Sequence, residues 1–277
     1  MRYETIQGLK SEDFRRLTGV KRETFDMMTA FLRTAKALQK ARGGKPNSVS
    51  IEDQILMMLS YWREYRTYFH IGKTYGVCES QAYRIIKWCE DTLAKSKDFR
   101  LPGRKDVAKV ELKDDIILID ATETPIERPP KKQRRYYSGK KKRHTLKTQI
   151  IVQKSQRRIL SITHDEGRRH DFELYKKSKI RAHPKTKLMV DSGYQGLQKM
   201  HANTEMPKKS SKNNPLTKED KAKNRKTSSE RVVCENVIGM LKRFKIVSDR
   251  YRNRRRRFGL RFFLIASIYN LELPELQ

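Results

Sequence analysis

The spacing of apolar residues changes once along this chain, close to residue 99. Before that point apolar residues recur at steps of three and four, which is the period of an amphipathic helix. After it come short continuous runs rich in Ile and Val, which are typical of buried strands, and these alternate with helical patterns. We therefore predict an all-α region over residues 1–98 and an α/β domain with a mixed sheet over residues 99–277.

The helical region contains the pattern of a helix-turn-helix over about residues 51–96. Gly76 supplies the turn, because glycine tolerates the left-handed conformation that often ends a helix. A short turn followed by a helix with basic residues is typical of DNA recognition. The alternative is an ordinary helical bundle whose basic residues have no binding role. Residues of the last helix predicted to reach DNA are Gln81, Tyr83, Arg84 and Lys87.

Two aspartates close apolar runs in the second part of the chain. Asp120 ends IILID and Asp191 ends KLMVD, so each is expected where a buried strand ends. Neighbouring strands would place both carboxylates at one edge of the sheet. Glu235 lies in the helical pattern SSERVVCENVIGMLKRFK and would complete a set of three acids. The alternatives are capping of strand ends for the aspartates and a surface position for the glutamate.

The three acids suit divalent metal ions, because Mg²⁺ prefers oxygen ligands and keeps several of its waters. Two such ions supply an activated water, stabilisation of the phosphoryl group and a stabilised leaving oxygen. Glu123 is the nearest competing acid and is expected outside direct coordination. Asp165 also competes, and Asp171 is expected to act as a helix N-terminal residue. The histidines and the three cysteines show no zinc-ligand spacing.

Positive charge dominates the composition, with 64 Lys and Arg against 32 acids and a net charge of +32. Such a chain is expected to bind a polyanion, either DNA or RNA, and a ribosomal type of RNA-coating protein is the alternative. A basic run over residues 128–147 is predicted to form a hairpin that delivers DNA to the three acids. Its predicted DNA contacts are Arg134, Arg135, Tyr136, Tyr137, Lys140, Lys141, Lys142 and Arg143.

Two further basic segments follow. Residues 203–229 read as a polar, basic loop or flexible insertion, and residues 250–261 contain seven arginines, of which Arg254 and Arg255 are predicted DNA contacts. The apolar face over Phe262–Leu271 is expected to pack on the sheet, and it is too short for a membrane span. No secretory signal is apparent, so a cytoplasmic, nucleoid-associated bacterial protein is expected.

Four motifs carry a resemblance that covers nearly the whole chain: IDATETPIERP, RRYYSGKKKRHTLKTQIIV, DSGYQG and ERVVCENVIGMLKRFKIVSDRYRNRRRRFGLRF. The chain resembles the DDE transposases of bacterial insertion sequences, and most of all their Harbinger-related branch. The resemblance implies an RNase H-like catalytic core with Asp120, Asp191 and Glu235 as the triad. It also implies two Mg²⁺ ions, for which Mn²⁺ is a substitute.

The same resemblance implies further residues and partners. Arg231, Glu235 and Lys242 fit the spacing of the family's Tyr, Arg, Glu, Lys pattern, whereas Ser228 stands at the tyrosine position. Spacings of four and seven put these three residues on one helix face, where the two cations are expected to hold DNA phosphate. Expected partners are double-stranded transposon ends, target DNA and a second copy of the chain or more. A nuclease without strand transfer and a DNA-binding regulator are the alternatives.

Overall fold

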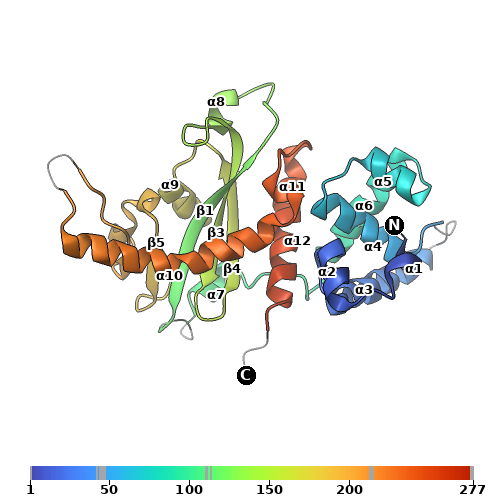
Figure 1. The fold of residues 1–277 in the computed structure, drawn as a ribbon, viewed down its shortest axis with the longest axis horizontal. Coiled ribbons are helices and arrows are strands. Elements are labelled where there is room, and N and C mark those ends of the chain that lie inside the picture. Colours follow the sequence, from blue (N-terminus) through green and yellow to red (C-terminus); the bar gives the residue numbers. More distant parts are fainter. Residues whose placement is uncertain are drawn as a thin grey trace. The chain divides into compact units, whose positions relative to one another are not determined.

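The computed structural model describes residues 2–41, 43, 48–109, 112, 114–211 and 215–274. These residues form two compact units, each considered by itself (Figure 1). The helical unit comprises residues 2–100, 241–249 and 253–274, and the sheet unit comprises residues 101–240 and 250–252. The chain passes from the helical unit to the sheet unit after residue 100, and residues 241–249 and 253–274 belong to the helical unit again.

The helical unit is organised around α4, which is flanked by α1, α2, α3, α5, α6 and α11. Ser50 is the N-cap of α4, since its side chain accepts a hydrogen bond from the Asp53 N–H at 3.1 Å. Leu56, Leu59 and Trp62 of α4 are fully buried. The unit's described elements are α1 (Tyr3–Ile6), α2 (Ser11–Thr18), α3 (Arg22–Lys40), α4 (Ile51–Arg63), α5 (Tyr68–Tyr75), α6 (Glu79–Leu93), α11 (Lys245–Ser248), η4 (Arg255–Arg257) and α12 (Phe258–Leu271).

The predicted helix-turn-helix is formed by α5 and α6. Gly76 ends α5 with φ of 72° in the left-handed region, where a side chain would be strained. Gly72 allows the turn to close, because a Cβ there would lie 2.6 Å from the carbonyl oxygen of Val77. The apolar residues that recur with the helical period on α6, from Ala82 to Leu93, are buried.

The C-terminal helix α12 belongs to the helical unit and contacts α6 there, whereas its apolar face was predicted to pack on the sheet. The physical reason is Glu90 of α6, whose side chain is completely buried. Its carboxylate accepts hydrogen bonds from Trp62 Nε1 at 2.9 Å, Arg261 Nε at 2.7 Å and Arg257 Nη2 at 2.6 Å. A buried carboxylate requires such partners, and η4 and α12 provide two of them.

The sheet unit contains a mixed sheet in the order β2-β3-β1-β5-β6, with β4 also paired to β3. β1 runs antiparallel to β3 and parallel to β5, and β4 runs antiparallel to β3. Its described strands are β1 (Ile116–Pro125), β2 (Tyr137–Ser138), β3 (Arg143–Gln153), β4 (Arg158–Glu166), β5 (Lys187–Val190) and β6 (Thr204–Glu205). Its described helices are α7 (Arg104–Val107), α8 (Gln133–Tyr136), α9 (Asp171–Ser178), η2 (Ser192–Tyr194), η3 (Leu197–Lys199) and α10 (Lys218–Lys242).

One face of the sheet carries the apolar core of this unit. Ile117, Ile119, Ile151 and Val190 meet Tyr175 of α9 there. The long helix α10 crosses the sheet in Figure 1 and contacts it through its middle part. One face of β1 therefore packs on the apolar core, and the other face lies against α10.

The predicted insertion over residues 203–229 is in large part ordered secondary structure, so its description as a loop was wrong. β6 lies at its start, and α10 begins at Lys218 instead of near residue 230. Thr217 and Asp220 form a capping box, because the Asp220 N–H donates to Thr217 Oγ1 at 3.0 Å and the Thr217 N–H donates to Asp220 Oδ2 at 3.2 Å. Residues 212–214 of this segment lie outside the described residues.

Candidate active site

Asp120 lies in the middle of β1, so its prediction as a strand-end residue was wrong. The apolar run stops at Ile119, but residues 121–125 continue to pair with β3. Side chains alternate along a strand, so Ile117 and Ile119 enter the core and Asp120 points to the opposite face. The side chain of Asp120 is 18% exposed. It is a largely desolvated carboxylate on the face that α10 crosses.

Asp191 follows β5 directly, as predicted. Its Oδ1 accepts a hydrogen bond from the Gly193 N–H at 2.8 Å, which begins the short helix η2. β1 and β5 are parallel and Ile119 pairs with Val190, so Asp120 and Asp191 hold the next position on each strand. The two aspartates therefore lie beside each other at the point where β5 ends.

Helix α10 brings a cation and the third acid to Asp120. Arg231 precedes Glu235 by one turn on the same face, and its Nη2 lies 3.6 Å from Asp120 Oδ1. Burial raises the pKa of Asp120 to about 6, while the Arg231 guanidinium lowers it and the carboxylates of Asp191 and Glu235 raise it. The structure thus brings all three predicted acids into one electrostatic neighbourhood.

The donor chemistry of this neighbourhood fits a hard divalent cation. Among the described residues, no three His, Cys, Asp or Glu side chains are close enough together to hold a metal ion. Asp120 instead accepts a hydrogen bond from the Ala121 N–H at 2.8 Å. The carboxylate oxygens are nevertheless of the type that Mg²⁺ takes, and one guanidinium offsets the three negative charges only in part. Asp120, Asp191 and Glu235 are the residues that would hold such ions.

A second polar cluster lies on the opposite face of the sheet, around the buried Lys147 of β3. Its Nζ pairs with Asp171 Oδ1 at 2.8 Å and lies 3.8 Å from Glu123 Oε1. Thr145 Oγ1 donates to the other oxygen of Glu123 at 2.8 Å. Asp171 begins α9 as expected, but His170 is the N-cap residue, and the Asp171 carboxylate pairs with Lys147. Lys147 thus offsets the charge of Asp171, its nearer partner, and part of that of Glu123.

Asp171 also touches the turn that positions Asp191. A Cβ at Gly193 would lie 2.4 Å from Asp171 Oδ2, so only glycine permits this approach. The next residue, Tyr194, is fully buried, and its hydroxyl has no hydrogen-bond partner within the described part of the chain. Burial, followed by the charges of Asp171, Asp120 and Asp191, raises the pKa of Tyr194. The two polar clusters therefore meet at this turn.

Sequence reasoning missed Lys147 and Tyr194 as neighbours of the acids. The alternation of β3 was the available signal for Lys147, since it shares a face with the core residue Ile151. Tyr194 lies within the DSGYQG motif, but the motif does not reveal that the ring is buried. The remaining competing acid, Asp165, has a structural explanation, because it pairs with Arg169 at 2.8 Å and with Lys177 at 3.1 Å.

The four residues predicted to contact DNA from the helix-turn-helix all lie on α6. Tyr83, Arg84 and Lys87 are exposed, whereas Gln81 is half-buried. The Tyr83 ring packs edge-on against Tyr68 of α5, with 5.4 Å between ring centroids. Three of the four predicted side chains are therefore exposed to solvent.

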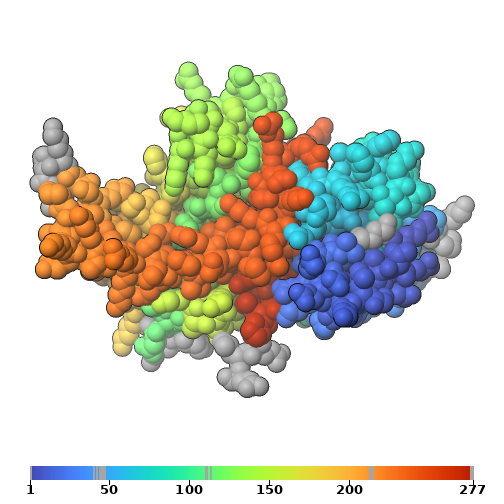
Figure 2. Space-filling model, viewed as in Figure 1, coloured from blue at the N-terminus to red at the C-terminus, as the bar shows by residue number. Residues whose placement is uncertain are grey.

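The predicted basic hairpin is present and consists of β2 and the start of β3, preceded by α8. It projects from the sheet in Figure 1, and Figure 2 shows the same segment in green at the surface. Arg135 Nε pairs with Glu166 Oε2 at 2.8 Å, so this cation also fastens the hairpin to β4. Tyr136 is half-buried, and the exposed predicted contacts are Arg134, Arg135, Tyr137, Lys140, Lys141, Lys142 and Arg143.

The remaining predicted DNA contacts fall in different units. Arg231 belongs to the sheet unit, whereas Lys242 ends α10 within the helical unit. Arg254 and Arg255 are exposed. Ser228, at the position where the resemblance expects a tyrosine, lies within α10.

Comparisons with known proteins agree with this architecture. Residues 119–268 match the family model described as DDE superfamily endonuclease, and residues 47–97 match the model described as helix-turn-helix of DDE superfamily endonuclease. The first match contains all three acids, and the second contains α4, α5 and α6. No solved structure matches the chain significantly. Among the described helices, none has the length and apolar character needed to cross a membrane.

Two relatives extend the match beyond these segments. The chain is 43% identical over 273 residues to a probable transposase for insertion sequence element IS702 from Microchaete diplosiphon, with 99% of each chain covered. It is 27% identical over 237 residues to a putative transposase for insertion sequence element IS112 from Streptomyces albus G, with 84% of each covered. The Harbinger-related branch stays a prediction, but the α/β core with a preceding helix-turn-helix is confirmed. The chain therefore belongs to the DDE superfamily of endonucleases.

Proposed function

We propose that this chain is a DNA transposase in which Asp120, Asp191 and Glu235 are the ligands of two Mg²⁺ ions. The superfamily membership and the relatives named as transposases support the activity. The observation that carries the residue assignment is the juxtaposition of Asp120 with Asp191, with Glu235 close enough to raise the pKa of Asp120. Bound there, the ions would supply an activated water and stabilise the phosphoryl group and the leaving oxygen.

The chain's own residues have distinct tasks in this proposal. Asp120, with a pKa of about 6, is largely ionised at neutral pH and is held in place by the Ala121 N–H. Arg231 lies 3.6 Å from Asp120, so its guanidinium is placed to bind an oxygen of the scissile phosphate. The Gly193 N–H orients Asp191. A freed 3′ hydroxyl of the element would then attack target DNA at the same site.

Recognition of DNA is assigned to surfaces outside the three acids. Tyr83, Arg84 and Lys87 of α6 would read the terminal inverted repeats. The exposed cations of the α8–β2–β3 hairpin would bind the phosphate backbone, which adds affinity without sequence selectivity. Two ends must be held together for transposition, so we expect at least a dimer on DNA.

The test uses the purified full-length chain with a plasmid that carries both ends of its element. We expect Mg²⁺-dependent cleavage at the ends, and joining of pre-cut ends to a second plasmid. Asp120→Asn should retain DNA binding and lose cleavage, whereas Glu127→Gln, at an exposed acid beyond β1, should retain both. Cleavage without joining would identify a nuclease, and binding without any cleavage would identify a regulator. Normal cleavage by Asp120→Asn would refute the residue assignment.

A further inference from the structure

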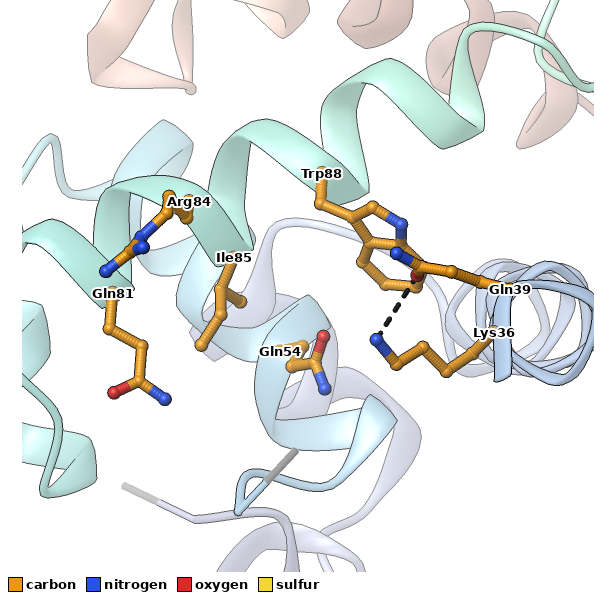
Figure 3. Close-up of a pocket in the computed structure, with 7 residues that line it drawn as sticks. All are labelled: Lys36, Gln39, Gln54, Gln81, Arg84, Ile85 and Trp88. Carbon is orange, nitrogen blue, oxygen red and sulfur yellow. Dashed lines mark hydrogen bonds between the residues drawn. The ribbon is translucent and has the colours of Figure 1, made fainter. Parts of the chain in front are cut away.

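A pocket of about 240 Å³ opens among α3, α4 and α6 of the helical unit. Figure 3 shows the arrangement of its walls, with α6 forming one side and residues of α3 approaching from the other. α3 lies outside residues 47–97, the part that matches the helix-turn-helix family model. The lining residues are Lys36, Gln39, Gln54, Gln81, Arg84, Ile85 and Trp88.

Trp88 gives the pocket a flat aromatic wall. Its ring is half-buried, and Lys36 Nζ lies 5.3 Å from the ring centroid. Lys36 Nζ also donates a hydrogen bond to Gln39 Oε1 at 3.2 Å, shown as the dashed line in Figure 3. An indole face is a surface on which a nucleobase can stack, whatever its identity. A lysine beside it can bind the phosphate that flanks such a base.

Three amide side chains reach the pocket from three different helices. Gln54 is 1% exposed, and its Nε2 donates to the Val49 carbonyl at 2.8 Å. This buried side chain lines the pocket. Gln39 and Gln81 line the walls. A primary amide carries donors and an acceptor together, which is the pattern needed to bind the edge of a base. In the free chain Gln39 Oε1 and Gln54 Nε2 already hold one hydrogen bond each, which a bound base would share or replace.

The size and the charge of the pocket restrict its ligand further. Pockets for drug-sized ligands measure roughly 300–1,000 Å³, so a volume of about 240 Å³ suits one planar group. Arg84 is exposed at the pocket and adds a second cation to Lys36. The ligand is therefore a small planar group that carries a neighbouring negative charge. Because α6 also carries the residues predicted to contact DNA, DNA is the polymer that would supply this group.

We propose that this pocket captures an unstacked base of the bound DNA. Trp88 stacks on the base, the three amides bind its edge, and Lys36 binds the adjoining phosphate. The inference rests on the proposed function only in requiring that the helical unit bind DNA. It adds α3 to the DNA-binding surface.

The experiment compares two single-stranded probes of equal length and charge. One is an oligodeoxyadenosine, and the other is the same deoxyribose-phosphate chain with every base removed. Binding is followed by tryptophan fluorescence, because Trp88 lines the pocket whereas Trp62 is fully buried against Glu90. We expect quenching by the first probe only, and binding at least about fivefold tighter than that of the abasic probe.

Two variants test the pocket itself. Because Trp88→Leu removes the fluorescent reporter, the variants are compared with the unmodified chain by the fluorescence anisotropy of labelled probes. Trp88→Leu should abolish the preference for the base-containing probe, and Gln39→Ala, at an exposed position, should reduce it. Leu38→Ala is the matched control on the same helix, since Leu38 is 69% exposed and lines no part of the pocket. A duplex with one unpaired adenine should likewise bind more tightly than a fully paired duplex to the unmodified chain.

The outcomes separate this proposal from the proposed function. Equal binding of both probes, or an unchanged preference in both variants, would show that only phosphate is bound and would overturn the proposal. Mg²⁺-dependent cleavage of plasmid DNA, measured on the same preparation, reports on the three acids. Base capture without cleavage would refute the transposase assignment and leave the pocket assignment standing.

Discussion

Replacing Asp120 by Asn should stabilise the metal-free chain while it abolishes cleavage. The reason is the cost of an ionised carboxylate at this position. Burial raises its pKa to about 6, with added repulsion from Asp191 and Glu235, and Arg231 offsets that cost only in part. Asn is close to Asp in shape and can accept the Ala121 N–H, but it carries no charge. The change therefore removes an ionised group that lowers the free energy of unfolding.

The magnitude follows from the pKa shift of Asp120, from 3.8 to about 6. About two units, at about 1.36 kcal/mol each, set an upper limit of about 3 kcal/mol. Arg231 is 14% exposed and loses its charged neighbour in the variant, which lowers the expected gain to about 1–3 kcal/mol. For units of this size such a gain raises the Tm by roughly 3–9 °C.

The gain should depend on pH in a defined direction. Between pH 4 and 6 the folded chain keeps a proton on Asp120 that the unfolded chain has lost. The free energy of unfolding of the unmodified chain therefore falls over this range and stays lower above it. The two proteins should have equal stability near pH 4 and differ most above about pH 6. A pH-dependent difference thus reports on Asp120 itself.

The assay is urea unfolding in EDTA from pH 4 to 8, read by circular dichroism. Asp165→Asn is the matched control, because Asp165 pairs with Arg169 and Lys177, and its neutralisation should destabilise the chain. A difference between Asp120→Asn and the unmodified chain that does not vary with pH would refute the reasoning. So would a loss of stability at pH 7.

Other expectations concern the paired charges, the metal and the hairpin. Glu90→Gln leaves Arg261 buried without a charged partner and should cost about 3–5 kcal/mol in urea unfolding; a cost below about 1 kcal/mol would contradict this. Lys147→Met should destabilise the chain by several kcal/mol, because Asp171 loses its cation, and unchanged stability would contradict this. Mg²⁺ at about 100 times its Kd should stabilise the unmodified chain by about 2.7 kcal/mol in thermal unfolding, and Asp120→Asn clearly less. Lys141→Ala should weaken binding to any duplex. It should also reduce the slope of log binding constant against log salt concentration by about one, as measured by fluorescence anisotropy in a salt series.

The elements that the sequence predicted well are those that local rules determine. α4, α5 and α6 follow from a helical period, a Ser50 cap and the Gly76 turn, and all of these depend on residues close in the sequence. The same holds for β3, β4 and β5, which follow short apolar runs, and for α9, which follows a helical pattern. The capping box at Thr217 and Asp220 was equally local, but the polar composition around it was read as a loop.

The predictions failed where contacts between distant parts of the chain determine the end of a strand or the packing of a helix. β1 continues past Asp120 because β3 pairs with it as far as Pro125, and no apolar run marks that extension. α12 joins α6 because Glu90 requires cations from Arg257 and Arg261, which lie far away in the sequence. Neither pairing leaves a periodic signal, so apolar pattern alone was a poor guide to both.

Because of the same contacts, the net charge of +32 overstates the number of cations that can bind DNA. Some cations of the basic runs pair with acids inside the fold and are not available to bind DNA. They are Arg257, Arg261 and Lys147. Arg135 has a surface partner as well. The salt dependence of DNA binding counts only the phosphates that are neutralised, so it should reflect the exposed cations of the hairpin and α6 and not the total composition. The cations of this chain therefore serve two purposes, because the buried ones stabilise the fold and the exposed ones remain available to bind a polyanion.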